Sequence, residues 1–148
     1  MGVILEILGN RVIQAAALAW AVAQALKVML TLAISRRFDK SRVLGSGGMP
    51  SSHSAMACAM LMTIGYREGF SSSIFALAFC FSGVVMYDAA GVRRSTGRNA
   101  AVINQMMDIL SGNGYVLDEK RLKELVGHTP IQVLAGALLG MLIGTLMA

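Results

Sequence analysis

Four stretches of the chain consist mainly of apolar residues, and polar residues or glycines separate them. They cover residues 12–34, 50–66, 73–92 and 130–148. A helix that crosses the hydrocarbon core of a bilayer needs about 20 apolar residues, with a lower limit near 17. The pattern therefore predicts an all-α integral membrane protein with about four transmembrane helices in a single domain, residues 1–148.

The stretch from residue 93 to residue 129 is the polar part of the chain. Within it, apolar residues recur on one helical face over Asn99–Leu110, which predicts an amphipathic helix in the membrane interface or over the bundle. Asp118–Val126 has the pattern of a short charged helix that begins at an aspartate cap. We therefore expect a short helical segment outside the membrane between the third and fourth spans.

Basic residues cluster after the first and third predicted spans. They are Arg36, Arg37, Lys40, Arg42, Arg93, Arg94, Arg98, Lys120, Arg121 and Lys123. The positive-inside rule places both segments in the cytoplasm and both chain ends outside a plasma membrane.

Composition favours the membrane interpretation over a nucleic-acid-binding one. Hydrophobic residues make up 55% of the chain and charged residues only 14%, whereas soluble domains carry about 25% charged residues. The net charge of +5 comes from residues between apolar runs, so membrane topology and anionic ligands explain it better than nucleic acid does. Cys58 and Cys80 lie inside apolar runs, and no metal-binding, cofactor or disulfide motif is present in the sequence.

Two histidines stand where apolar runs begin. His53 lies in the stretch GGMPSSHS, and His128 lies in the stretch GHTP. Helix starts attract anions because they carry unpaired N–H groups and the positive end of the helix dipole. Both histidines fall on the same predicted membrane face, so together they could form a phosphate site with a nucleophile and an acid.

Five polar residues on that face could complete such a site. Ser51 and Ser52 could offer hydrogen-bond donors, Arg93 and Arg94 could hold phosphoryl oxygens, and Asp88 could neutralise or orient a partner. Each also has an ordinary interpretation, as a helix cap, a membrane anchor or an ion pair. Because all of them share one face with the histidines, we favour a functional site.

Lys27 lies inside the first predicted span, three residues after Gln24 on the same helical face. One interpretation is that its ammonium group reaches back to the membrane surface. The other is that both side chains point into the bundle toward a ligand. The sequence leaves these alternatives open.

Gly136, Gly140 and Gly144 recur at intervals of four in the last predicted span. Such a stripe is typical of close helix packing, either within one bundle or in a homodimer.

Several motifs carry a resemblance to a known family. GMPSSHSA resembles the PSGH motif of the type 2 phosphatidic acid phosphatase superfamily, which also contains the vanadium haloperoxidases. GHTPIQVLAGALLG resembles the third motif of that superfamily. With YDAAGVRR between them, most of the chain is similar to the divergent branch of these membrane phosphatases.

The resemblance implies a metal-free hydrolase that acts on a phosphate monoester or diphosphate of a lipid or isoprenoid. It implies that His128 is the nucleophile that attacks phosphorus and that His53 protonates the leaving group. It also implies that Ser51 binds a phosphoryl oxygen.

The chain departs from the family pattern at three places. The aspartate that orients the nucleophilic histidine is replaced by Gln132, which can accept a hydrogen bond but cannot balance a positive charge. Gln132 is therefore a candidate substrate-binding residue, and Asp88 could substitute for the aspartate. The arginine of the third motif falls on Leu122, so Arg93 or Arg94 could serve instead. The first motif is not met after Lys27. A non-catalytic lipid-phosphate binding or transport protein, and a structural membrane scaffold, are therefore the alternatives.

Overall fold

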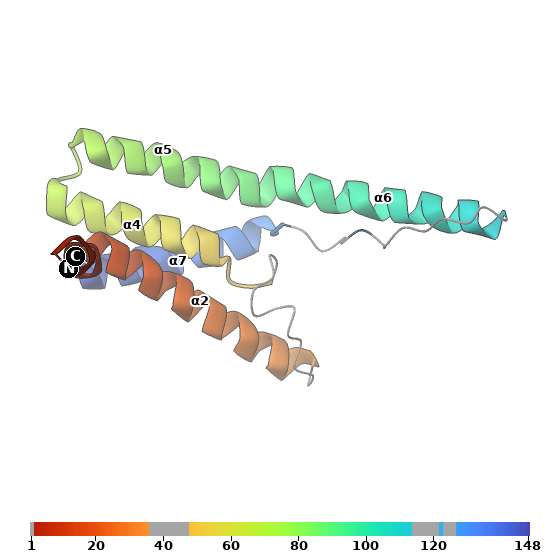
Figure 1. Ribbon diagram of the computed structural model, residues 1–148, viewed down its shortest axis with the longest axis horizontal. Coiled ribbons are helices and arrows are strands. Elements are labelled where there is room, and N and C mark those ends of the chain that lie inside the picture. The colour runs from red at the N-terminus through yellow and green to blue at the C-terminus, as the bar shows by residue number, and fades with distance from the viewer. Residues whose placement is uncertain (1, 36–47, 114–121, 123–126) are drawn as a thin grey trace.

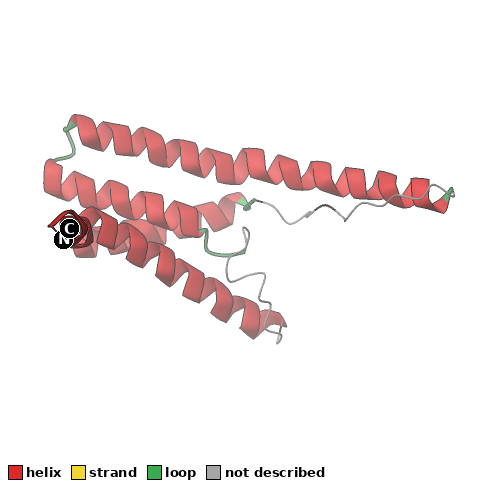
Figure 2. Cartoon of the chain, in the orientation of Figure 1, coloured by secondary structure: helices red, strands yellow, loops and turns green. Residues whose placement is uncertain are grey.

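The computed structural model describes residues 2–35, 48–113, 122 and 127–148, and helices make up most of this part of the chain (Figure 2). Its elements are α1 (Gly2–Gly9), α2 (Arg11–Ser35), α4 (Ser52–Glu68), α5 (Ser73–Tyr87), the π-helical turn η1 (Asp88–Val92), α6 (Arg93–Gly112) and α7 (Pro130–Met147). Successive long helices run in opposite directions (Figure 1). The starts of α4 and α7 therefore lie at the same end of the bundle, away from the marked chain ends.

Helix α4 is the centre of the bundle. It packs against α2, α5 and α7, and α2 also packs against α7. The core where these helices meet is built mainly from small residues, which allow close approach of the backbones. The cluster consists of Ala19, Ala23, Ala55, Ala59 and Ile143.

The glycine stripe of α7 faces α4 within the same chain. A methyl group on any of the three glycines would collide with a main-chain carbonyl oxygen of α4. The facing pairs are Gly136 with Ser51, Gly140 with Ala55 and Gly144 with Ala59. Packing within the bundle is therefore the role of this stripe, and a homodimer through the same glycines would have to displace α4.

Three helices in the described part of the chain are long and apolar enough to cross a membrane. They comprise Arg11–Ala33, Ser73–Gly112 and Pro130–Met147. Helix α4, which corresponds to the second predicted span, has only 17 residues and carries several small polar side chains. The length and hydropathy of the helices therefore support three of the four predicted spans.

The helix of the third predicted span, residues 73–92, does not end at residue 92. The helix continues without a break from Ser73 to Gly112, through η1 and into α6. At 1.5 Å per residue it is about 60 Å long, twice the roughly 30 Å of a hydrocarbon core. No proline interrupts this stretch, so the helix expected over residues 99–110 is continuous with that of the third predicted span rather than separate from it. Only about half of the combined length fits inside a hydrocarbon core. The helix predicted over residues 118–126 lies outside the described residues, apart from Leu122.

Helix α1 was not expected from the sequence pattern. Asn10 separates it from α2 and caps α2, because its Oδ1 accepts the N–H groups of Val12 at 2.9 Å and Ile13 at 3.2 Å. The large apolar side chains of α1 are all exposed. The first predicted span begins only after this cap and therefore does not include α1.

Large apolar side chains cover much of the outer surface. Examples on α5 and α7 are Leu77, Phe79, Leu134, Leu138 and Leu142, each more than half exposed. A soluble monomer rarely exposes so much contiguous apolar surface, whereas a bilayer solvates it.

Candidate functional site

The starts of α4 and α7 are tied together by their main chains. The N–H of Ser51, the N-cap of α4, donates to the carbonyl oxygen of Gln132 in the first turn of α7 at 3.0 Å. Thr129 caps α7 and forms a reciprocal capping box with Gln132. These contacts bring His53 and His128, which are far apart in the sequence, to one end of the bundle.

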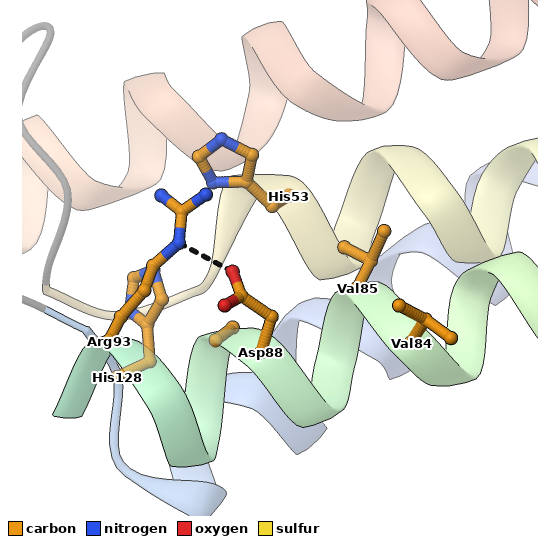
Figure 3. Close-up of a pocket in the computed structure, with 7 residues that line it drawn as sticks. His53, Val84, Val85, Asp88, Arg93 and His128 are labelled. Atoms are coloured by element: carbon orange, nitrogen blue, oxygen red, sulfur yellow. Dashed lines mark hydrogen bonds and ion pairs between the residues drawn. The ribbon is translucent and has the colours of Figure 1, made fainter. Parts of the chain in front are cut away.

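A cavity of about 250 Å³ lies at this end (Figure 3). Both histidines line it, together with an acidic and a basic side chain and three apolar residues. The complete set is His53, Val84, Val85, Asp88, Ala89, Arg93 and His128. The cavity therefore combines a polar site with an apolar wall supplied by α5.

Asp88 and Arg93, which both line the cavity, form an ion pair. Asp88 Oδ2 lies 2.6 Å from Arg93 Nε, and both side chains are about two-fifths exposed. The pair leaves the two terminal guanidinium nitrogens of Arg93 pointing toward His53 (Figure 3). These nitrogens are in a suitable position for an oxyanion in the cavity.

The side chain of Gln132 contacts the ring of His128. The main-chain N–H of Thr129 donates to Gln132 Oε1 at 3.0 Å, which fixes the orientation of the amide. The same oxygen lies 3.4 Å from His128 Nδ1. An amide oxygen only accepts hydrogen bonds, so this contact favours the tautomer of the neutral ring that has its hydrogen on Nδ1.

The surroundings of His128 favour this neutral form. Burial lowers the pKa of His128 below its ordinary value, against the hydrogen bond to Gln132, which raises it. The positive charge of Lys27 and the nearby His53 lower the pKa further, and a backbone hydrogen bond with Gly48 opposes them. A histidine with a lowered pKa is unprotonated at neutral pH and can act as a nucleophile.

Lys27 lies inside the bundle rather than at the membrane surface. Its side chain is only 1% exposed, and its Nζ donates to Gln24 Oε1 at 2.6 Å. The interpretation that Lys27 reaches back to the surface is therefore wrong. The charge of Lys27 instead acts on the ring of His128.

Five residues that the sequence suggested as ligands do not line the cavity, namely Lys27, Ser51, Ser52, Arg94 and Gln132. Ser51 and Ser52 are buried, and the hydroxyl of Ser51 accepts hydrogen bonds from the N–H and the hydroxyl of Ser54. The side chain of Arg94 is exposed outside the cavity. The structure thus brings His53, Asp88, Arg93 and His128 together around the cavity. Gln132 contacts the ring of His128, and the charge of Lys27 acts on it.

The apolar wall of the cavity and the π-helical turn were not expected from the sequence. Val84 and Val85 look like ordinary residues of a span, so no sequence signal marks them. The run of small residues after Asp88 was the one available sign of unusual helix geometry. Among the described residues, no group of three or more histidine, cysteine or acidic side chains is arranged to hold a metal ion.

The helices and the site define a class: a helical membrane protein with a polar cavity of two histidines, an arginine and a carboxylate at one end of its bundle. A model of the Divergent PAP2 family matches residues 8–143, and the chain belongs to that family. The resemblance seen in the motifs is thereby confirmed.

The chain is also similar to a bacterial protein, the Uncharacterized membrane protein YuiD of Bacillus subtilis (strain 168). The two are 37% identical over 156 residues, which cover 97% of this chain and 98% of that protein. No solved structure matches the chain.

Proposed function

We propose that this protein is a membrane phosphatase that hydrolyses a phosphate monoester or diphosphate on a lipid or isoprenoid through a phosphohistidine intermediate. The observation that carries the proposal is the meeting of His128, His53 and Arg93 around one cavity. They come from three separate segments: the loop before α7, the first turn of α4 and the start of α6.

In the proposed mechanism each step is assigned to one residue. Nε2 of neutral His128 attacks phosphorus, and the bond between phosphorus and the leaving oxygen breaks. His53 donates a proton to that oxygen, and Arg93 stabilises the charge on the phosphoryl oxygens. A water molecule then attacks the phosphohistidine and gives a proton to His53, releasing phosphate and restoring His128.

The membrane arrangement in this proposal has four spans, with α4 as a short span enclosed by α2, α5 and α7. The clusters of basic residues support a cytoplasmic position for the cavity in a plasma membrane. The apolar wall of Val84 and Val85 supports a substrate with an apolar tail.

A non-catalytic lipid-phosphate binding or transport protein is the second candidate. Gln132 favours it, because an uncharged amide cannot compensate the positive charge that develops on His128 during attack. That protein would bind phosphate at the same cavity without turnover.

The test is phosphate release by the detergent-purified protein with a chelator present. The substrates are phosphatidate, phosphatidylglycerophosphate and prenyl phosphates. We expect release by the wild type, loss in His128→Ala and Arg93→Ala, and retention in the matched control Arg94→Ala, whose side chain lies outside the cavity. Phosphate binding without release from any substrate would favour the binding protein, and release by His128→Ala would contradict the nucleophilic role.

A further inference from the structure

The π-helical turn η1 aligns Asp88 with Arg93. In this turn the N–H of Arg93 donates to the carbonyl oxygen of Asp88, five residues earlier. Residues five apart in an α-helix point about 140° away from each other, because each residue advances by about 100°. The wider turn places the two side chains on one face, where their ion pair forms.

The same turn also holds the main chain of His128. Where five-residue bonding returns to four-residue bonding, one carbonyl oxygen is passed over by the helix. Ala89 directly follows Asp88, and its carbonyl oxygen accepts the main-chain N–H of His128 at 3.0 Å. A bond from the loop before α7 thus ends on the π-helical turn.

We propose that η1 is the positioning element of the phosphate site, with Asp88 holding Arg93 through Nε and Ala89 holding His128 through its carbonyl oxygen. The inference deepens the proposed function and rests on it for its catalytic meaning. Asp88 and Ala89 act through Arg93 and His128, so they are positioning residues. The arrangement ties the guanidinium group of Arg93 and the main chain of His128 to one rigid helix, which limits their relative motion.

Deletion of Gly91 tests the positioning role of η1 separately from the formation of the helix. Removing one residue from a π-helical turn restores a regular α-helix with both flanking helices in register. Asp88 and Arg93 then stand four apart and still share a face, but the surplus carbonyl oxygen is gone. The matched control is Gly91→Ala, because a methyl group there meets nothing within 4 Å and the number of residues is unchanged.

The measurement is the pKa of the His128 ring, taken from NMR spectra of protein labelled with ¹⁵N-histidine. The chain has only two histidines, so His53→Asn assigns the spectrum. We expect the deletion to move the pKa of His128 toward the ordinary value of about 6.5 and to weaken inorganic phosphate binding at least tenfold. Gly91→Ala should retain both. A folded deletion variant with the His128 signals and phosphate affinity of the wild type would overturn the proposal.

A second variant tests the positioning role of η1 even if the deletion variant does not fold. Asp88→Asn keeps the size of the side chain and removes a negative charge, which by electrostatics alone would strengthen phosphate binding. A positioning role predicts the opposite: at least threefold weaker phosphate binding, with a lower kcat wherever the wild type shows turnover. Equal or tighter binding would overturn the proposal.

The phosphate titration and the histidine spectra do not depend on turnover. If no lipid substrate releases phosphate, the proposed phosphatase activity fails while the positioning role of η1 is still decided.

Discussion

Gly127 lies directly against the main chain of Arg94, so no side chain fits between the loop that carries His128 and the start of α6. A methyl group on Gly127 would lie 2.5 Å from the amide nitrogen of Arg94. Gly127 also has a φ of 90°, which is rarely adopted by residues with a side chain. The loop before α7 therefore packs closely against the start of α6, which carries Arg93.

Gly127→Ala should therefore displace His128. We expect a loss of phosphate binding and a lower thermal midpoint, because the variant combines backbone strain with a collision. Gly69→Ala is the matched control, since Gly69 has the same φ of 90° with nothing within 4 Å. The control should show only the backbone strain, about 1–3 kcal/mol. Equal effects of the two variants on phosphate binding would contradict the importance of the contact.

Gly140→Ala should destabilise the bundle. The added methyl group would collide with the carbonyl oxygen of Ala55, so α7 would have to move away from α4. Overpacking of this kind costs typically 1–3 kcal/mol. Thermal unfolding in detergent measures the effect, and Gly83→Ala on α5 is the control because its methyl group meets nothing within 4 Å. An unchanged midpoint for Gly140→Ala would mean that α7 and α4 are not packed this closely.

Gln132→Glu should make His128 more basic. The two side chains have nearly the same shape, so a glutamate can accept the same hydrogen bonds while adding a negative charge. We expect the pKa of His128 to rise by about one unit or more and formation of the phosphohistidine to accelerate. The control is Gln105→Glu, an exposed position on α6 with the same change of charge. If both variants behave alike in the histidine spectra, Gln132 does not hold the ring of His128.

The lowered pKa of His128 also predicts a pH dependence. In the proposed mechanism the neutral ring is the nucleophile, so the fall of kcat/KM at acid pH should set in at a lower pH than the ordinary histidine pKa of about 6.5 would give. Between the lowered pKa and the ordinary value of about 6.5, the unfolded chain binds more protons at this residue than the folded protein does. The stability that His128 contributes is therefore complete above pH 6.5 and decreases as the pH falls.

Thermal midpoints of the wild type and His128→Gln between pH 5 and pH 7.5 test the predicted pH dependence of stability. The difference between the two proteins should change over this range in favour of the wild type at high pH. A pKa of His128 at or above 6.5 in the folded protein would refute both expectations.

The sequence by itself determined the class of protein and most of its helices. Long apolar runs can only be accommodated as helices in a bilayer, because lipid offers no partners for free backbone groups. Local chemistry also marked the starts of α4 and α7, where Ser51 and Thr129 are N-caps as their residue types indicate. The two histidines were recognised because each stands beside such a start.

The tertiary structure decided which polar residues meet. Arg93 and Arg94 look equivalent in the sequence, yet only Arg93 reaches the cavity, because the π-helical turn aligns it with Asp88. The tertiary structure likewise decided that Lys27 is buried and that the glycine stripe faces α4. These outcomes depend on helix phase and on contacts between segments far apart in the chain, and hydrophobic periodicity encodes neither of them.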